Sequence, residues 1–115
     1  MADVGDVRRI ALGLPGTEEG TSYGTVAFRV RKRPFARIHE DVGLLVLWCA
    51  DMEEKAALLA AVPTTFTTTP HYDGYPLVLV RLAVVDAAEL TELLTDAWRH
   101  RAPARLVEQF DAAGR

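Results

Sequence analysis

The chain has 115 residues, of which half are hydrophobic and a quarter are charged, and its formal net charge is −3. This length suits one domain with its own core, and we expect a single domain over residues 1–115. The negative charge argues against a protein whose whole surface grips nucleic acid, because phosphate neutralisation supplies most non-specific affinity. The single cysteine, Cys49, excludes an internal disulfide and a CxxC motif.

The sequence also indicates where the protein works. No segment approaches the roughly 20 consecutive apolar residues of a membrane helix. The N-terminus carries Asp3 and Asp6 and no hydrophobic signal core. We therefore expect a cytoplasmic protein that has no membrane partner.

The first predicted element is an amphipathic helix over residues 3–14, with Asp3 as its N-cap and Pro15 after its end. Residues 15–25 form a polar connector that is rich in glycine and proline. Tyr23 stands directly before the next element. It either caps the edge of a sheet or lines a binding surface.

Residues 25–39 alternate apolar and basic side chains, with a break at Lys32-Arg33, which predicts a β-hairpin. Burying an unpaired guanidinium costs several kcal/mol, whereas a buried Phe or Ile stabilises by roughly 1.5–3 kcal/mol. We therefore expect one face to pack under the helices and the other to meet solvent. The packed face holds Phe28, Val30, Ala36 and Ile38, and the solvent face holds Arg29, Arg31 and Arg37. Phe35 either shares the open face or is covered by the segment around Leu106 and Phe110.

A turn at 40–43 leads into a third strand, Leu44 to Cys49, which shows no polar alternation. Trp48 in this strand is either a core residue or an apolar platform on the open sheet face. A second helix is predicted from Asp51 to Val62, and Pro63 ends it. A short fourth strand is expected near residues 65–68.

The segment 70–76 is a turn cluster that gathers His71, Tyr72 and Tyr75, and loops carry function more often than strands do. Leu77 to Leu82 is the fifth predicted strand and contains Arg81. A third helix is expected over 86–100, and a short fourth helix with Pro103 at its first position. We expect the tail after Asp111 to fray.

These elements predict an α+β fold of two layers. The connections at 31–34 and 39–44 are too short for parallel crossovers, which need a dozen or more residues. We expect a five-stranded antiparallel sheet with helices on one face, in the order α-β-β-β-α-β-β-α-α.

The residues give no reaction chemistry. His39, His71 and Asp73 lack metal-ligand spacing, and Ser22, the only serine, has no G-x-S-x-G around it. The turn carboxylates at Glu18, Glu19, Glu40 and Asp41 are typical of solvated charges. We expect no enzyme activity, no metal and no cofactor.

Several stretches in this order resemble the MmcQ/YjbR family of small bacterial proteins, over roughly residues 3–110. They are Leu14-Pro15-Gly16, Tyr23-Gly24, Phe28-Arg29-Val30, Pro34-Phe35-Ala36, the loop at 69–76 and Val78-Leu79-Val80. Tyr23 stands where many relatives have tryptophan. The resemblance implies a fold like that of secretion chaperones and a non-enzymatic protein. The family is commonly labelled DNA-binding.

Two functional hypotheses remain. The first is a DNA-binding module whose anion-binding face is the basic hairpin, although the same charges could be a solvated face that prevents edge pairing. Its donors would be Arg29, Arg31, Lys32, Arg33 and Arg37. The second is a protein- or small-ligand-binding module that uses the apolar sheet face and the aromatic loop. Candidate stacking or ligand residues for either are Tyr23, Phe35, Trp48, His71, Tyr72, Tyr75 and Arg81.

Overall fold

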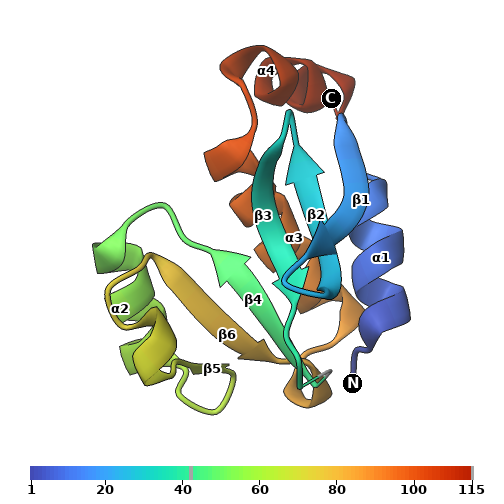
Figure 1. Ribbon diagram of the computed structural model, residues 1–115. Coiled ribbons are helices and arrows are strands. Elements are labelled where there is room, and N and C mark those ends of the chain that lie inside the picture. The colour runs from blue at the N-terminus through green and yellow to red at the C-terminus, as the bar shows by residue number, and fades with distance from the viewer. Residues whose placement is uncertain (42, 115) are drawn as a thin grey trace.

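The computed structural model describes residues 1–41 and 43–114 (Figure 1). The first half of the chain forms one helix and four strands: α1 (Val4–Leu12), β1 (Thr17–Ser22), β2 (Thr25–Val30), β3 (Arg33–Ile38) and β4 (Leu44–Trp48). The second half contributes α2 (Met52–Ala61), β5 (Phe66–Thr67), η1 (Pro70–Tyr72), β6 (Leu77–Arg81), η2 (Leu82–Val84), α3 (Ala87–Arg101) and α4 (Ala104–Ala113). Val42, in the predicted turn at 40–43, and Arg115, in the predicted tail, lie outside the described residues.

In the described part of the chain the sheet has six strands in the order β1-β2-β3-β4-β6-β5, and every pairing is antiparallel. The antiparallel α+β fold is confirmed, but the expected count of five strands was wrong. The additional strand, β1, lies in the segment that we predicted to be a polar connector. Its sequence, TEEGTS, has no large apolar residue and hence no period-2 signal. Backbone pairing with β2 holds it at the sheet edge, from Thr17 opposite Val30 to Ser22 opposite Thr25.

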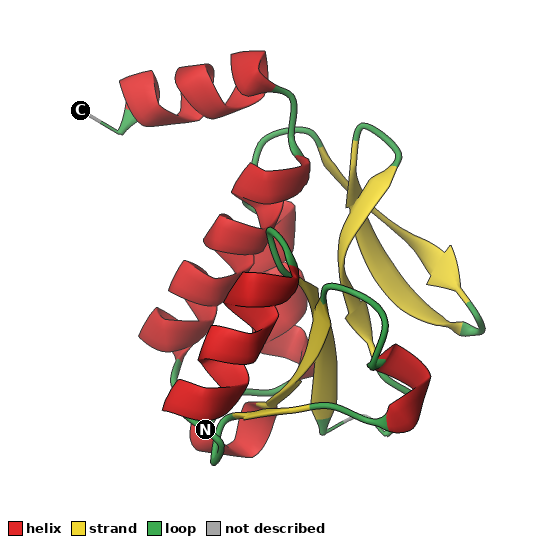
Figure 2. Cartoon of the chain, turned by 90° about the vertical axis from the view of Figure 1, so that its left-hand side faces the viewer, coloured by secondary structure: helices red, strands yellow, loops and turns green. Residues whose placement is uncertain are grey.

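The long helices lie on one side of the sheet, and one short helical turn lies on the other (Figure 2). Trp98 and Leu94 of α3, Val7 of α1 and Phe28 of β2 are fully buried in the core between the helices and the sheet. A buried Phe or Leu side chain stabilises by roughly 1.5–3 kcal/mol, so this layer supplies most of the apolar driving force for folding.

The predicted helix starts are confirmed by their caps. Asp3 and Asp6 form a capping box at α1, since each carboxylate accepts from the other residue's backbone N–H at 3.0 Å. Asp51 and Asp86 accept from the backbone N–H groups of Glu54 and Glu89, each at 2.8 Å. At α4, Pro103 is the N-cap and not the first helical residue, and the helix runs to Ala113, past the point where we expected fraying.

The inward face of the hairpin is confirmed, because Phe28, Val30, Ala36 and Ile38 all lie in the core. Phe35 also lies there and has no exposed surface, so the expectation that it stands with the arginines was wrong. The pairing register shifts between Phe28, opposite Ala36, and Arg29, opposite Pro34. This bulge leaves Phe35 as the extra residue and turns it toward the helices, into the same cluster as Leu106. Phe35 is therefore a core residue on the helix side of the sheet, where α3 packs against β3.

Among the described residues, no helix combines the length and the hydropathy needed to cross a membrane.

Candidate functional site: a groove on the open face of the sheet

The face of the sheet turned away from the helices carries its own apolar side chains. Leu45 and Leu47 of β4 point into the main core, so Val46 between them points the other way. Val46 packs there with Leu79 of β6 and with Tyr72, which η1 lays over the strands. Arg37 pairs with Val46 across β3 and β4 and therefore stands on the same face.

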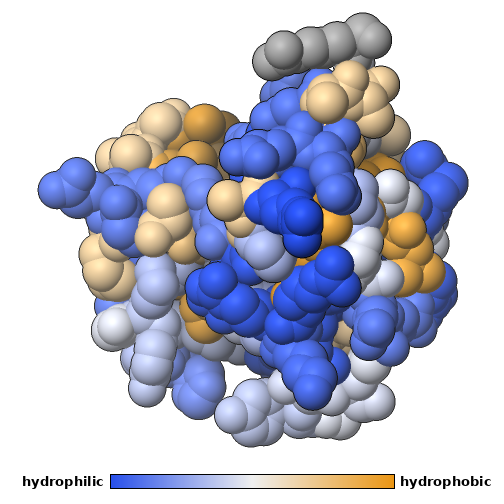
Figure 3. Space-filling view, turned by 90° about the horizontal axis from the view of Figure 1, so that it is seen from above, coloured by the Kyte–Doolittle hydropathy of each residue, from blue (hydrophilic) through white to orange (hydrophobic). Residues whose placement is uncertain are grey.

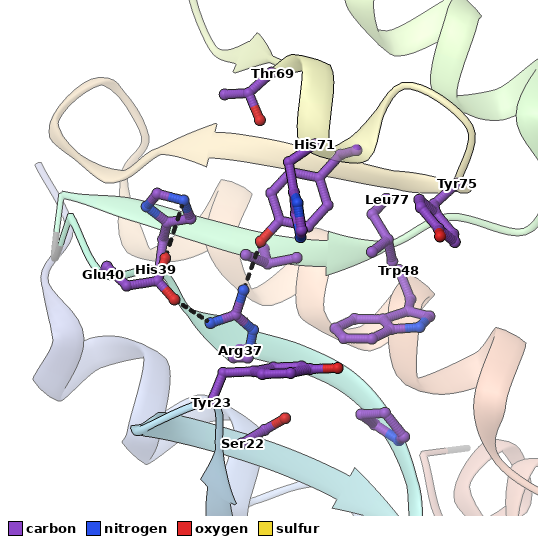
Figure 4. Close-up of a pocket in the computed structure, with 13 residues that line it drawn as sticks. Ser22, Tyr23, Arg37, His39, Glu40, Trp48, Thr69, His71, Tyr75 and Leu77 are labelled. Atoms are coloured by element: carbon purple, nitrogen blue, oxygen red, sulfur yellow. Dashed lines mark hydrogen bonds and ion pairs between the residues drawn. The ribbon is translucent and has the colours of Figure 1, made fainter.

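Beside this cluster lies a groove with a volume of about 840 Å³. It is bounded by the β1–β2 turn, the middle strands and the segment 69–77 (Figure 4). The chain brings together here six of the predicted site residues: Tyr23, Arg37, Trp48, His71, Tyr72 and Tyr75. These six residues come from distant parts of the sequence, so no local sequence pattern could predict that they lie together.

Arg37 lies within the groove wall and is only 6% exposed. One of its Nη atoms donates to the Thr25 hydroxyl at 2.9 Å and to a Glu40 carboxylate oxygen at 3.1 Å. The other donates to the Tyr72 hydroxyl at 2.5 Å. The expectation that Arg37 faces solvent was therefore wrong. Its strand face was assigned correctly, but the burial cost of an unpaired guanidinium does not apply once three partners satisfy the charge.

Tyr23 covers the outer side of Arg37. The Arg37 guanidinium carbon lies 5.7 Å from the centre of the Tyr23 ring, a cation–π distance. Tyr23 and Gly24 both have positive φ, at 52° and 79°, which is typical of the tight two-residue turns between antiparallel strands. Tyrosine is disfavoured in that conformation, and the side chain is 89% exposed. An exposed aromatic ring in a strained turn beside a groove is a feature found at ligand sites.

The two ends of the groove differ in chemistry. Figure 4 shows Glu40 and His39 at one end, Trp48, Leu77 and Tyr75 at the other, and Arg37 between them. Trp48 and Leu77 are paired across β4 and β6 and are both half-buried. Trp48 is thus an apolar platform on the open face, as one of our two alternatives stated.

Sequence reasoning missed the contribution of Glu40, which we interpreted as a solvated charge, and of His39, which we considered as a metal ligand and set aside. The His39 Nδ1 accepts from the backbone N–H of Asp41 at 3.1 Å, and its Nε2 lies 3.3 Å from Glu40. A backbone hydrogen bond, then the hydrogen bond and charge of Arg37, hold the pKa of Glu40 below its usual value. Glu40 therefore remains a carboxylate at neutral pH.

Lys55 of α2 was also missed, although it positions one wall of the groove. The side chain is 4% exposed, and its ammonium donates to the carbonyl oxygens of Tyr72 and Tyr75. No pattern in the sequence marked Lys55 as buried, since apolar residues and alanines are spread around α2 and Met52, one turn earlier, is 46% exposed. A buried ammonium needs oxygen acceptors, and the turn at 72–75 supplies them.

The predicted row of five basic residues separates into three groups. Arg37 joins the groove. Arg29 lies along β1, where it donates to the Thr21 carbonyl at 3.0 Å and passes close over Gly20. Arg31, Lys32 and Arg33 are exposed at the β2–β3 turn.

Near this turn a charge of β3, Arg33, lies close to a charge of α3, Arg101. Arg101 of α3 donates to the Pro34 carbonyl at 2.9 Å, and burial together with the charge of Arg33 lowers its pKa. Viewed from above, the end of the molecule that carries α4 shows strongly hydrophilic side chains gathered in its centre (Figure 3).

The remaining predicted residues lie outside the groove. Arg81 donates to the Pro63 carbonyl at 2.8 Å and braces the start of β5, and Phe35 belongs to the core. Within residues 1–41 and 43–114, no cluster of three His, Cys, Asp or Glu side chains could hold a metal ion.

The chain is similar to uncharacterized mycobacterial proteins and to a solved structure from Deinococcus radiodurans. The uncharacterized proteins Rv2570 of Mycobacterium tuberculosis (strain H37Rv) and Mb2600 of Mycobacterium bovis are each 38% identical to it, over 96% of this chain and 96% of theirs. The crystal structure of Deinococcus radiodurans protein DR2400, which carries the family-model domain DUF419, is similar with a TM-score of 0.70. That protein is 29% identical, and the match covers 85% of this chain and 77% of the other.

The sequence model of the YjbR family matches residues 12–100, which run from the end of α1 almost to the end of α3. This span includes every strand of the sheet and every residue that lines the groove. The chain therefore belongs to the YjbR family.

Proposed function

We propose that this protein is a non-enzymatic binding module that holds a small aromatic ligand in the groove on the open face of its sheet. The observation that carries the proposal is the convergence of aromatic side chains from three separate segments, represented by Tyr23, Trp48 and Tyr75. The volume of about 840 Å³ lies within the range typical of small-molecule sites. Flat rings on the walls favour a flat ligand, because aromatic pairs gain about 0.5–1.5 kcal/mol beyond area burial.

The polar groups of the groove support binding and orientation. Arg37 donates its hydrogen bonds to Thr25, Glu40 and Tyr72, which hold the guanidinium in one place. His39 uses its Nδ1 as an acceptor within its own turn. Tyr72 is committed through its hydroxyl to Arg37. Fixed donors and rings of this kind set the orientation of a ligand.

A screen of aromatic fragments by ligand-observed NMR tests the proposal, with Trp48→Ala as the groove variant. Removing the indole deletes a large stacking surface, and we expect about tenfold or greater loss of affinity for the fragments that bind. Leu12→Ala is the matched control, because Leu12 is 44% exposed on α1, away from the groove. Binding that survives Trp48→Ala unchanged would contradict the proposal.

We retain DNA binding as a second candidate on a separate observation. The exposed Arg31, Lys32 and Arg33 lie at one turn, and Arg101 lies near them, where burial and, to a smaller degree, the charge of Arg33 lower its pKa. Clustered cations attract phosphate, and such binding weakens steeply as salt rises.

Salt titration of DNA binding tests this candidate on wild type and on Arg31→Gln/Lys32→Gln/Arg33→Gln. The triple variant should bind more weakly and with a shallower salt dependence, because it forms fewer phosphate contacts. Arg9→Gln is a control on the exposed side of α1. Absence of retention on single- and double-stranded DNA at low salt would remove the candidate.

A further inference from the structure

We infer that the ligand of the groove is an aromatic molecule bearing a carboxylate or a phosphate, and that this anion binds Arg37 in place of Glu40. The inference rests on the proposed function and adds the charge and the chemical class of the ligand. It follows from how Arg37 is neutralised in the groove wall.

Arg37 is a buried cation that a single hydrogen bond joins to its counter-charge, the Glu40 carboxylate. Two of its three side-chain partners, Thr25 and Tyr72, are neutral hydroxyls. Glu40 supplies the negative charge, through one oxygen at 3.1 Å. A guanidinium can hold a carboxylate or phosphate by two parallel hydrogen bonds, which is stronger and more directional than this single contact.

Glu40 is suited to being displaced. Its side chain is 59% exposed while that of Arg37 is 7% exposed, so the pair joins a buried cation to a surface anion. The exposed carboxylate can rotate into water and recover its hydration, so its departure leaves the buried guanidinium as the group that needs a new counter-charge. Arg37 cannot follow it, since it is held by Thr25 and Tyr72. An arriving anion would restore the charge balance that the departing carboxylate removes.

The layout of the groove fixes where the rest of such a ligand lies. Arg37 stands between the polar end and the apolar end formed by Trp48 and Leu77 (Figure 4). A ligand whose anion reaches Arg37 therefore places its ring against Trp48. Aromatic carboxylates and aromatic phosphates share this arrangement, and a matched probe set distinguishes them.

The test measures binding of 2-naphthoate, 2-naphthyl phosphate and the neutral 2-naphthylmethanol by isothermal titration calorimetry. Wild type should bind at least one anionic probe about tenfold or more tightly than the neutral one, as a charge-assisted hydrogen bond requires. The stronger of the two anions identifies the source of the charge. Glu40→Gln should tighten the anionic probes roughly two- to fivefold, because the competing carboxylate is gone, and leave the neutral probe unchanged.

Glu18→Gln is the matched control, since it removes one exposed carboxylate on β1 and changes the net charge equally. Arg37→Lys keeps the charge but loses the paired donors, and should lower the preference for the anion. Glu40→Gln involves an exposed side chain, so the inference stays testable even if the Arg37 variant does not fold.

The outcomes separate the two proposals. If the neutral probe binds as tightly as both anions and Glu40→Gln changes nothing, the anion inference is overturned while the aromatic groove stands. Equal tightening by Glu18→Gln would also overturn it, because the effect would then be one of net charge. If none of the three probes binds wild type, both the inference and the proposed function fail.

Discussion

Arg37 imposes strict requirements on its surroundings because a guanidinium out of water must keep every hydrogen bond that it can. Its acceptors arrive from three places: Thr25 at the start of β2, Glu40 after β3 and Tyr72 in η1. The residue therefore serves two purposes. It ties η1 to the sheet, and it places a positive charge in the groove wall.

Replacing Tyr72 by Phe should destabilise the protein by about 1–3 kcal/mol, because a buried charged donor loses its acceptor. Chemical denaturation gives the free energy of unfolding. Tyr75→Phe is the control, since the Tyr75 side chain is 59% exposed, and it should change that free energy by less than about 0.5 kcal/mol. Equal effects of the two substitutions would show that the Arg37–Tyr72 hydrogen bond does not contribute to stability.

Cys49 should be unreactive in the folded protein. Burial, with a smaller effect of the Glu54 charge, raises the pKa of its thiol to about 12 from an ordinary value of 9.0. At about pH 8 only ~1 thiol in 10,000 is then ionised, against ~1 in 10 when unfolded, and the thiolate is the reactive form. Ellman's reagent should react far more slowly in native buffer than in guanidinium chloride. Comparable rates would mean that the thiol is accessible.

The same shift of the Cys49 pKa affects stability at high pH. The folded state binds the thiol proton more tightly than the unfolded state does. This contribution is complete below about pH 9 and declines as the pH rises toward 12. Cys49→Ser would remove that component of the alkaline loss, which pH-dependent denaturation can measure.

At the scale of elements, both two-residue hairpin turns hold non-glycine residues at positive φ. Arg31 and Lys32 have φ of 50° and 69°, as Tyr23 and Gly24 do at the neighbouring turn. Such conformations cost roughly 1–2 kcal/mol per non-glycine residue. The molecule thus keeps one aromatic and two basic side chains at its turns at the expense of stability.

The substitution Arg31→Asn/Lys32→Gly should stabilise the protein by about 1–2 kcal/mol, because Asn-Gly is the preferred pair for a turn with two positive φ values. Thermal denaturation measures the gain. The same variant should weaken DNA binding if the second functional candidate is right. Arg9→Asn on α1 serves as a control for loss of a surface charge. A turn variant that is less stable than wild type would contradict the argument that positive φ values strain Arg31 and Lys32.

For the molecule as a whole, the sheet separates a structural face, covered by the long helices, from the face that carries the groove. Trp98 of α3 lies wholly on the structural side, where its Nε1 donates to the Pro15 carbonyl at 2.9 Å and its ring lies 5.1 Å from that of Phe110. It joins α3 to the α1–β1 connection and to α4. The groove, on the other side, has no residue from α1, α3 or α4 in its lining.

Trp98→Phe should therefore lower the free energy of unfolding by roughly 1–3 kcal/mol, through lost ring atoms and a lost hydrogen bond. Affinity for the naphthyl probes should stay within about twofold of wild type, because the sheet shields the groove. Denaturation and calorimetry on the same sample measure both. A parallel loss of affinity would indicate that the two faces are coupled.

Local features of the chain were predictable because they depend on nearby residues. Asp3, Asp51 and Asp86 mark their helix starts by bonding backbone groups within three residues. The alternation around Phe28 and Val30 assigned the core face of the hairpin, and short connections excluded parallel strands. The edge strand β1 was not predicted, because its sequence has no apolar alternation. Backbone pairing with β2 holds it in place.

The sequence by itself thus determined the order of most elements, the antiparallel sheet and the aromatic composition of the segments that line the groove. Only the tertiary structure decided which charges are buried. The hydroxyl partners of Arg37 lie 12 and 35 residues away, and Phe35 changes sides because of a bulge in the β2–β3 pairing. A periodic pattern reports the average preference of a side chain for water. Whether one guanidinium is buried depends on which distant acceptors the fold places beside it. Those partners decide whether its burial lowers or raises the stability of the folded state.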